Sequence, residues 1–224
     1  MLRWYEEAEV CYVYLSDVQY DSASGRQVAV GFEQSKWFTR GWTLQELLAP
    51  EDLTFFDHNW EAIGTRESLT STQSKKIISQ SLSEITGIPD TILHSGWRYL
   101  HLRQDMPSVA QRMSWASKRQ TSRVEDLAYC LLGIFNVNMP LLYGEGEKAF
   151  IRLQQEIIKH SEDESIFAWS IPNERMMRRL FTSLFAPSPE CFVLSSGVEQ
   201  RKHVSWIKHS PYGTFSRNRV EFDP

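Results

Sequence analysis

Long hydrophobic runs are absent from this 224-residue sequence. Its most apolar stretch, residues 128–135, is much shorter than the roughly 20 residues that a membrane-spanning helix needs. The N-terminus begins Met-Leu-Arg-Trp-Tyr-Glu-Glu, which lacks the apolar core of a secretory signal peptide. We therefore expect no membrane span and a cytoplasmic location.

Positive charge is not in excess either. The 24 lysines and arginines are outnumbered by 28 aspartates and glutamates, which gives a net charge of −4. A domain that binds nucleic acid usually carries a clustered basic surface. We therefore predict that nucleic acid is not a partner.

Cysteine and histidine are too few and too scattered for a disulfide framework or a metal site. The three cysteines, Cys11, Cys130 and Cys191, are odd in number and far apart, which is typical of buried thiols in a reducing compartment. His58 has no ligand partner at metal spacing. The stretch Tyr143-Gly-Glu-Gly146 lacks the lysine of a phosphate-binding loop. We predict no metal and no bound cofactor.

Tryptophan, in contrast, is abundant, and the densest run of unusual residues is 35–50. Ser35 is a predicted N-cap and Pro50 a natural stop, and the spacing of apolar residues predicts one helix over residues 35–48. Trp42 and Glu46 are four residues apart, so they lie on one face of that helix. A carboxylate beside an indole is typical of a catalytic group in an apolar cleft, but a structural helix produces the same pair. Both interpretations stay open.

The order of the predicted elements indicates an α/β fold. A helix over residues 1–8 precedes a strand over 9–15, whose nearly continuous apolar character predicts burial on both faces. A second strand over 51–57 follows the helix of residues 35–48. A strand–helix–strand unit of this kind predicts parallel strands, so we expect a partial parallel sheet.

The second half of the chain is predicted to be rich in helices. Ser108 is a predicted N-cap, and a capping-box pattern at residues 122–125 predicts a buried helix that runs through Ile134. A long amphipathic helix over 147–160 follows. Beyond it the composition shifts toward short strands and turns, and we predict a small appended segment over 161–224.

Several motifs, all in one order, resemble the fungal heterokaryon incompatibility (HET) domain. The most specific is Arg40-Gly-Trp-Thr-Leu-Gln-Glu-Leu47, which Ala49-Pro50 follow. The others lie at residues 2–5, 11–17, 84–89, 112–119, 125–135 and 139–146. The resemblance implies a HET domain over residues 1–160 that lacks the family's usual N-terminal strands. It also implies that residues 161–224 are an incomplete copy of the segment found after HET domains.

This resemblance implies an effector of fungal non-self recognition, a form of innate immunity that ends in programmed cell death. The expected partners are further copies of the chain, or other HET or NOD-like signalling proteins. Because the usual upstream strands are missing, a non-functional truncated remnant is an alternative.

A third function comes from the distant similarity of HET domains to TIR domains, some of which cleave NAD. It implies a TIR-like, flavodoxin-like strand order and makes NAD a substrate. In those enzymes a Trp-x-x-x-Glu arrangement, matched here by Trp42 and Glu46, carries the essential carboxylate. Glu46 would then stabilise the oxocarbenium charge, and Trp42, Arg40 and Asp17 are the candidate substrate-binding residues.

Each candidate also has a structural interpretation. Trp42 suits core packing, and Asp17 and Asp57 suit turns at strand ends. Arg40 suits an ion pair, and Glu46 suits a helix residue that pairs with Arg40 or with a neighbouring amide. Arg119, like Arg112, suits a solvated helix face.

Overall fold

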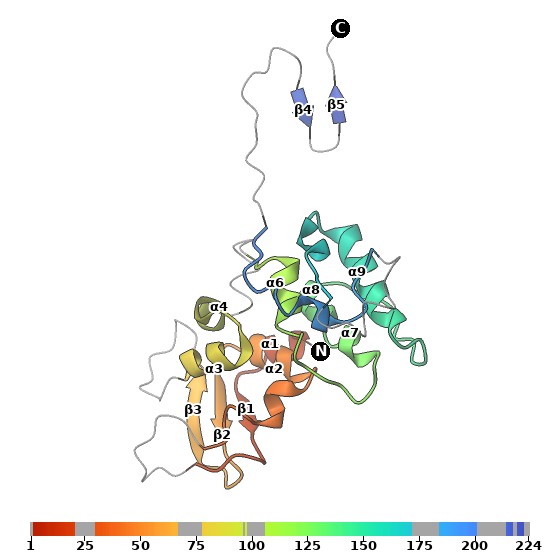
Figure 1. The fold of residues 1–224 in the computed structure, drawn as a ribbon. Coiled ribbons are helices and arrows are strands. Elements are labelled where there is room, and N and C mark those ends of the chain that lie inside the picture. Colours follow the sequence, from red (N-terminus) through yellow and green to blue (C-terminus); the bar gives the residue numbers. More distant parts are fainter. Residues whose placement is uncertain are drawn as a thin grey trace.

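The computed structural model describes residues 2–20, 30–66, 78–95, 97, 106–171, 184–200, 214–216 and 219–221. In Figure 1 the three-stranded sheet lies at one end and helices α6 to α9 at the other, with α1 and α2 between them. The elements are α1 (Leu2–Glu6), β1 (Cys11–Tyr14), η2 (Lys36–Thr39), α2 (Thr43–Leu48), β2 (Leu53–Phe56), β3 (Ala62–Arg66), α3 (Ser79–Thr86), α4 (Asp90–Ser95), α6 (Val109–Ser114), α7 (Asp126–Tyr129), α8 (Leu132–Phe135), α9 (Lys148–His160), η3 (Glu164–Phe167), η4 (Pro189–Phe192), β4 (Thr214–Ser216) and β5 (Arg219–Glu221).

The sheet confirms the predicted α/β class. Strand β1 pairs with β2 in parallel, with Cys11 opposite Leu53 and Tyr14 opposite Phe56, and α2 lies between them in the chain. Strand β3 pairs with β2 in the antiparallel sense, so the sheet is mixed and its order is β1-β2-β3. The TIR-like, flavodoxin-like strand order remains an expectation.

The prediction that the first strand is buried on both faces is wrong. Val13 and Leu15 are buried, whereas Tyr12 is 62% exposed and Tyr14 is 42% exposed. The ring of Tyr14 stacks on Trp60 at a centroid distance of 4.7 Å. Alternating burial of this kind belongs to a strand with one covered face. The other face of β1 is therefore an aromatic surface.

The single helix predicted over residues 35–48 is two short helices, η2 and α2. Arg40 between them has an extended backbone with ψ of 138° and pairs in parallel with Gln120. The amide of Gly41 donates to the carbonyl of Gln120 at 2.9 Å. A Cβ on Gly41 would lie 2.5 Å from Cγ2 of Thr121, so glycine allows this close approach. A distant segment thus replaces the helical hydrogen bonds that the local pattern predicted.

The helix predicted from residue 122 through Ile134 is also divided, into α7 and α8. The predicted capping box at its start is wrong, because Glu125 makes no side-chain cap and instead accepts hydrogen bonds from Gly144 and Gly146. Ser108, however, caps α6 as predicted.

Helix α9 agrees with the predicted long helix, and two buried polar side chains anchor the segment after it. Gln154 donates to the carbonyl of Ala186 at 2.7 Å and accepts from its amide at 3.0 Å. Asp163 accepts from the amide of Val109 at 2.7 Å and from that of Ser165 at 3.0 Å. The acidic stretch after α9 is therefore packed against the start of α6.

The segment predicted over 161–224 extends beyond the described residues. So does the stretch before α3, since residues 67–77 lie outside the described part of the chain. Gly87 ends α3 with φ of 69°, a conformation that glycine adopts without strain. Strands β4 and β5 form an antiparallel hairpin within the segment predicted after residue 160.

Candidate functional site

The candidate carboxylate, Glu46, is half-buried on α2 and faces α1. Its Oε1 accepts a hydrogen bond from the hydroxyl of Tyr5 at 3.2 Å. Glu46 is not among the ion pairs of the described residues. Of the two structural partners expected for Glu46, the ion pair with Arg40 is not formed, and Tyr5, which sequence reasoning did not single out, is its hydrogen-bond donor.

The charge of Glu46 affects three neighbouring groups. Burial, with help from Glu46, raises the pKa of Tyr5 to about 12, so this hydroxyl is a neutral donor at physiological pH. Burial and then Glu46 raise the pKa of the Cys11 thiol, which makes it a poor nucleophile. Burial lowers the pKa of Arg119 to about 10, and Cys130 and Glu46 oppose that shift. Arg119 therefore stays charged.

Arg119 is not on a solvated helix face, as the sequence suggested. It is only 6% exposed, and it comes after the end of α6 at Ser114. Its Nη1 donates to the carbonyl of Arg40 at 2.8 Å and to Oγ1 of Thr43 at 2.9 Å. Its Nε donates to the carbonyl of Trp115 at 3.2 Å. This buried cation thus fixes the break between η2 and α2, just before the turn that carries Glu46.

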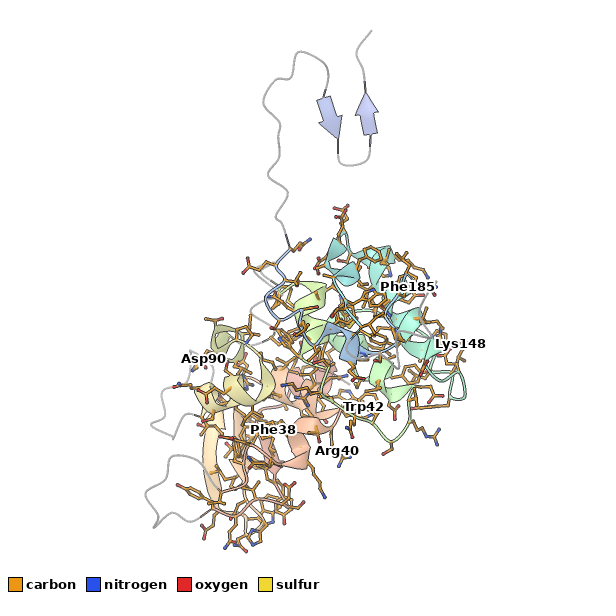
Figure 2. The ribbon with its side chains drawn as sticks, viewed as in Figure 1. Phe38, Arg40, Trp42, Asp90, Lys148 and Phe185 are labelled. Atoms are coloured by element: carbon orange, nitrogen blue, oxygen red, sulfur yellow. The ribbon has the colours of Figure 1, made fainter. Side chains whose placement is uncertain are left out.

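Arg40 contributes its backbone and not its side chain. Its carbonyl accepts from Arg119 and from Thr43, while the side chain is exposed and is not among the ion pairs of the described residues. Figure 2 shows Arg40 and Trp42 close to each other near the start of α2. The guanidinium is free to meet solvent or a ligand.

Asp17 acts as the turn residue that the structural interpretation predicted. It accepts from Oγ of Ser35 at 2.7 Å and from the amide of Lys36 at 2.8 Å, which ties the end of β1 to the start of η2. Partial burial raises its pKa, but these hydrogen bonds outweigh that effect and the pKa is lowered. Each of its carboxylate oxygens already accepts a hydrogen bond within the turn, which weakens its case as a substrate ligand.

Asp57 has the same role at the end of β2. The carboxylate is fully buried and accepts three backbone hydrogen bonds, from Tyr20, Asn59 and Glu61, at 3.0, 2.8 and 2.9 Å. Burial raises its pKa, and the hydrogen bonds lower it below its usual value. The two strand-end aspartates therefore shape turns.

Two hollows flank α1. The first, called here the β1 hollow, has a volume of about 410 Å³ and is lined by Trp4, Tyr5, Ala8, Val10, Cys11 and Tyr12. The second, called here the α1 groove, has a volume of about 890 Å³ and is lined by Leu2, Arg3, Trp4, Glu6, Trp42, Gln45, Tyr129, Leu132, Gly133, Asn136, Val137, Asn138 and Leu141.

The hollows separate the two residues of the Trp-x-x-x-Glu pair. Trp42 lines the α1 groove, whereas Glu46 lines neither hollow and reaches the β1 hollow only through its bond to Tyr5. Trp4 lines both, so α1 forms the ridge between them. The sequence placed Trp42 and Glu46 on one helix. In the structure Glu46 lies in α2, Trp42 is the N-cap residue before it, and the two do not share a pocket.

The described residues contain neither a metal-binding cluster nor a membrane-spanning helix. In these parts of the chain, no group of three or more histidine, cysteine, aspartate or glutamate side chains is arranged to hold a metal ion. None of the helices described has the length and apolar character to cross a bilayer.

The comparison with known proteins gives one extensive match. The vegetative incompatibility protein HET-E-1 of Podospora anserina is 45% identical to this chain, in an alignment 224 positions long that covers 94% of the chain. The chain is similar to a fungal heterokaryon incompatibility protein. This confirms the resemblance that the motifs indicated. The match spans 15% of the length of HET-E-1.

A family model described as a domain of unknown function (DUF8212) matches residues 148–212. In the described part of the chain this match contains α9, η3 and η4, and it begins at the first residue of α9. The division into domains after residue 160 remains a prediction. No solved structure gives a significant match.

Proposed function

We propose that this chain is a cytoplasmic effector module of fungal non-self recognition that triggers programmed cell death. The observation that carries the proposal is the 45% identity to HET-E-1 across almost the whole chain. The most specific motif, residues 40–50, supports it from within the fold. Its Gly41 packs against Gln120 and Thr121, and its Gln45 donates to the carbonyl of Cys130, so the motif joins the sheet to the helical half.

We further propose that the module signals by associating with other copies of itself. Among the described residues, β1 has a neighbouring strand only on its β2 side, so its other edge is available for pairing. The face beside that edge is aromatic and exposed at Tyr12, Tyr14 and Trp60. Unpaired strand edges and exposed aromatic faces are both common contact surfaces between proteins.

The test is inducible expression of the chain in a filamentous fungus, with death scored by a vital dye. Wild type should kill. Gly41→Val should not, because its side chain would collide with Thr121 and separate the two halves. Tyr12→Lys should leave the fold intact, lower the mass measured by light scattering and reduce killing. A folded wild-type chain that leaves cells alive would overturn the proposal.

A second candidate function is cleavage of NAD with Glu46 as the catalytic carboxylate. The observation that favours it is the environment of Glu46, which is half-buried, hydrogen-bonded to Tyr5 and close to the buried cation of Arg119. A carboxylate held by a neutral donor can stabilise positive charge that develops on a ribose. Arg40, exposed near the same helix, is the group available to a phosphate.

NAD consumption by wild type and Glu46→Gln, measured side by side, tests this candidate. Glutamine keeps the shape and still accepts a hydrogen bond from Tyr5, and circular dichroism checks that both proteins fold. An enzyme loses turnover and cell killing together in Glu46→Gln. A module that acts only through contacts keeps its killing in that variant and consumes no NAD in either form.

A further inference from the structure

The α1 groove has the dimensions of a small-molecule site. Its volume of about 890 Å³ falls within the range of roughly 300–1,000 Å³ that is usual for ligand pockets. Its walls come from three parts of the chain: α1, the start of α2, and the stretch from α7 to Leu141. A site built from several packed elements holds its shape better than one formed by a single loop.

Two indole side chains line the groove, and one is more deeply buried than the other. Trp42 is half-buried and Trp4 is 77% exposed, so one indole lies deeper than the other. Indoles offer a flat face on which planar rings stack. Leu132 and Leu141 add further apolar surface. These walls favour a flat ligand over a flexible one.

A side chain with an unsatisfied amide oxygen lines the groove. Gln45 lines it and is only 2% exposed, and its Nε2 donates to the carbonyl of Cys130 at 2.5 Å. Its Oε1 is buried and accepts no hydrogen bond from the described residues. A buried acceptor without a donor is costly and uncommon in a folded protein. The side chain that carries this unpaired acceptor lines the groove together with Trp42.

Two more amides lie at the rim. Asn136 and Asn138 are exposed and line the groove, and their side chains form no hydrogen bonds with the described residues. Asn136 is held in place as the left-handed cap of α8, with φ of 51°. Arg3 and Glu6 line the groove with opposite charges. The groove therefore offers amide donors and acceptors and no net charge.

We propose that the α1 groove binds a planar, uncharged nucleobase that carries an exocyclic amino group, of the adenine class. Asparagine and glutamine amides pair with the amino and ring-nitrogen edge of adenine, and tryptophan stacks on its faces. Adenosine is the appropriate probe, because the balanced charges of Arg3 and Glu6 give the groove nothing to hold a phosphate. The binding site is separate from the Glu46 carboxylate.

Isothermal titration calorimetry with adenosine tests the proposal. Purine riboside, which lacks the exocyclic amino group, is the matched ligand and should bind about tenfold more weakly. Trp4→Ala should also weaken adenosine binding about tenfold, and Asn138→Ala should weaken it as well. The side chains of Trp4 and Asn138 are exposed, so both variants should retain the fold. Trp60→Ala is the matched control: Trp60 is 61% exposed, lines neither hollow and should leave binding unchanged.

Three results would overturn the proposal. The first is no saturable heat with adenosine, and the second is equal affinity for adenosine and purine riboside. The third combines two measurements: wild type does not bind adenosine, and Trp4→Ala has a lower oligomeric mass than wild type in light scattering. In that case a second copy of the chain would occupy the groove. The readout is binding, so neither cell killing nor NAD turnover enters the result.

Discussion

The hydroxyl of Tyr5 donates a hydrogen bond to the carboxylate of Glu46, and the two atoms are 3.2 Å apart. Tyr5 belongs to α1 and Glu46 to α2, so this bond joins the first helix of the chain to its most distinctive motif. The same bond places Tyr5 between Glu46 and the β1 hollow. Tyr5 therefore links Glu46 to the lining of that hollow.

We predict that Tyr5→Phe removes a contribution to the free energy of unfolding that wild type loses at alkaline pH. The pKa of Tyr5 in the folded protein, about 12, lies above its usual value of 10.0. The contribution of the protonated hydroxyl is therefore complete below pH 10 and is lost as the pH rises toward 12. At pH 8 the variant should be less stable by about 1 kcal/mol, from the lost hydrogen bond. Urea unfolding at pH 8 to 11 measures both effects.

Phe is the suitable replacement because it keeps the ring and removes only the hydroxyl. Tyr12→Phe is the matched control, since that side chain is 62% exposed and its ring contacts Phe56. The free energy of unfolding of Tyr12→Phe should match that of wild type at every pH. If Tyr5→Phe lost as much stability at high pH as wild type does, the alkaline loss would come from groups other than Tyr5.

Arg119→Met should be strongly destabilising, and Arg40→Met should not. Arg119 is buried and donates three hydrogen bonds, to Arg40, Thr43 and Trp115, whereas the side chain of Arg40 is exposed. Removing the buried guanidinium leaves buried acceptors unpaired, and we expect a loss of about 2–4 kcal/mol. The exposed change should stay within about 0.5 kcal/mol. Guanidinium chloride unfolding compares them, and the reverse order would refute the assignment of roles.

The same two arginines explain why the sequence predicted the fold better than the site. The helices, the parallel strand pair and the cap at Ser108 depend on local patterns, which a sequence displays. Burial of Arg119 depends on contacts with residues some 80 positions earlier, such as Arg40 at a separation of 79. Nothing near Arg119 in the sequence signals that contact. The extended backbone of Arg40, which divides the predicted helix, likewise depends on a distant residue, Gln120.

Glu125 illustrates a local signal that a distant partner overrides. The pattern Ser122-Arg-Val-Glu125 fits a capping box, but the amides of Gly144 and Gly146 compete for the carboxylate and hold it. Among the candidate site residues, the sequence placed Trp42 and Glu46 one helical turn apart, and in the structure Trp42 is the N-cap residue of the helix that carries Glu46. It could not show that α1 would lie over Glu46, because that depends on how Leu2 packs against Gly133.

Gly133→Ala should separate α1 from α8. A Cβ at Gly133 would lie 2.6 Å from Cβ of Leu2, so one helix must move. Overpacking of this kind costs about 1–3 kcal/mol. Gly197→Ala is the matched control, because a Cβ there meets nothing within 4 Å and its φ is not positive. Urea unfolding measures the difference between the variants, and equal stability would mean that α1 is not held by this contact.

Glu125→Gln should loosen the loop that ends at Gly146. Backbone hydrogen bonds from the residue's own amide and from Gly146 and Gly144 lower the pKa of Glu125 below its usual value of 4.5. The stabilisation is therefore complete above pH 4.5 and is lost as the pH falls through the lowered pKa. Hydrogen exchange of the Gly144 and Gly146 amides reports it directly. Wild type should protect them at pH 6 and lose protection in acid, whereas Glu125→Gln should protect them poorly at both.

Glu147→Gln is the matched control for this experiment. Glu147 is exposed at the start of α9, two residues after Glu145, and makes no side-chain cap of its own. The neutral variant should keep the wild-type protection of Gly144 and Gly146 and the wild-type loss in acid. If Glu125→Gln also keeps both, the two amides are held by the packing of the loop and not by the carboxylate.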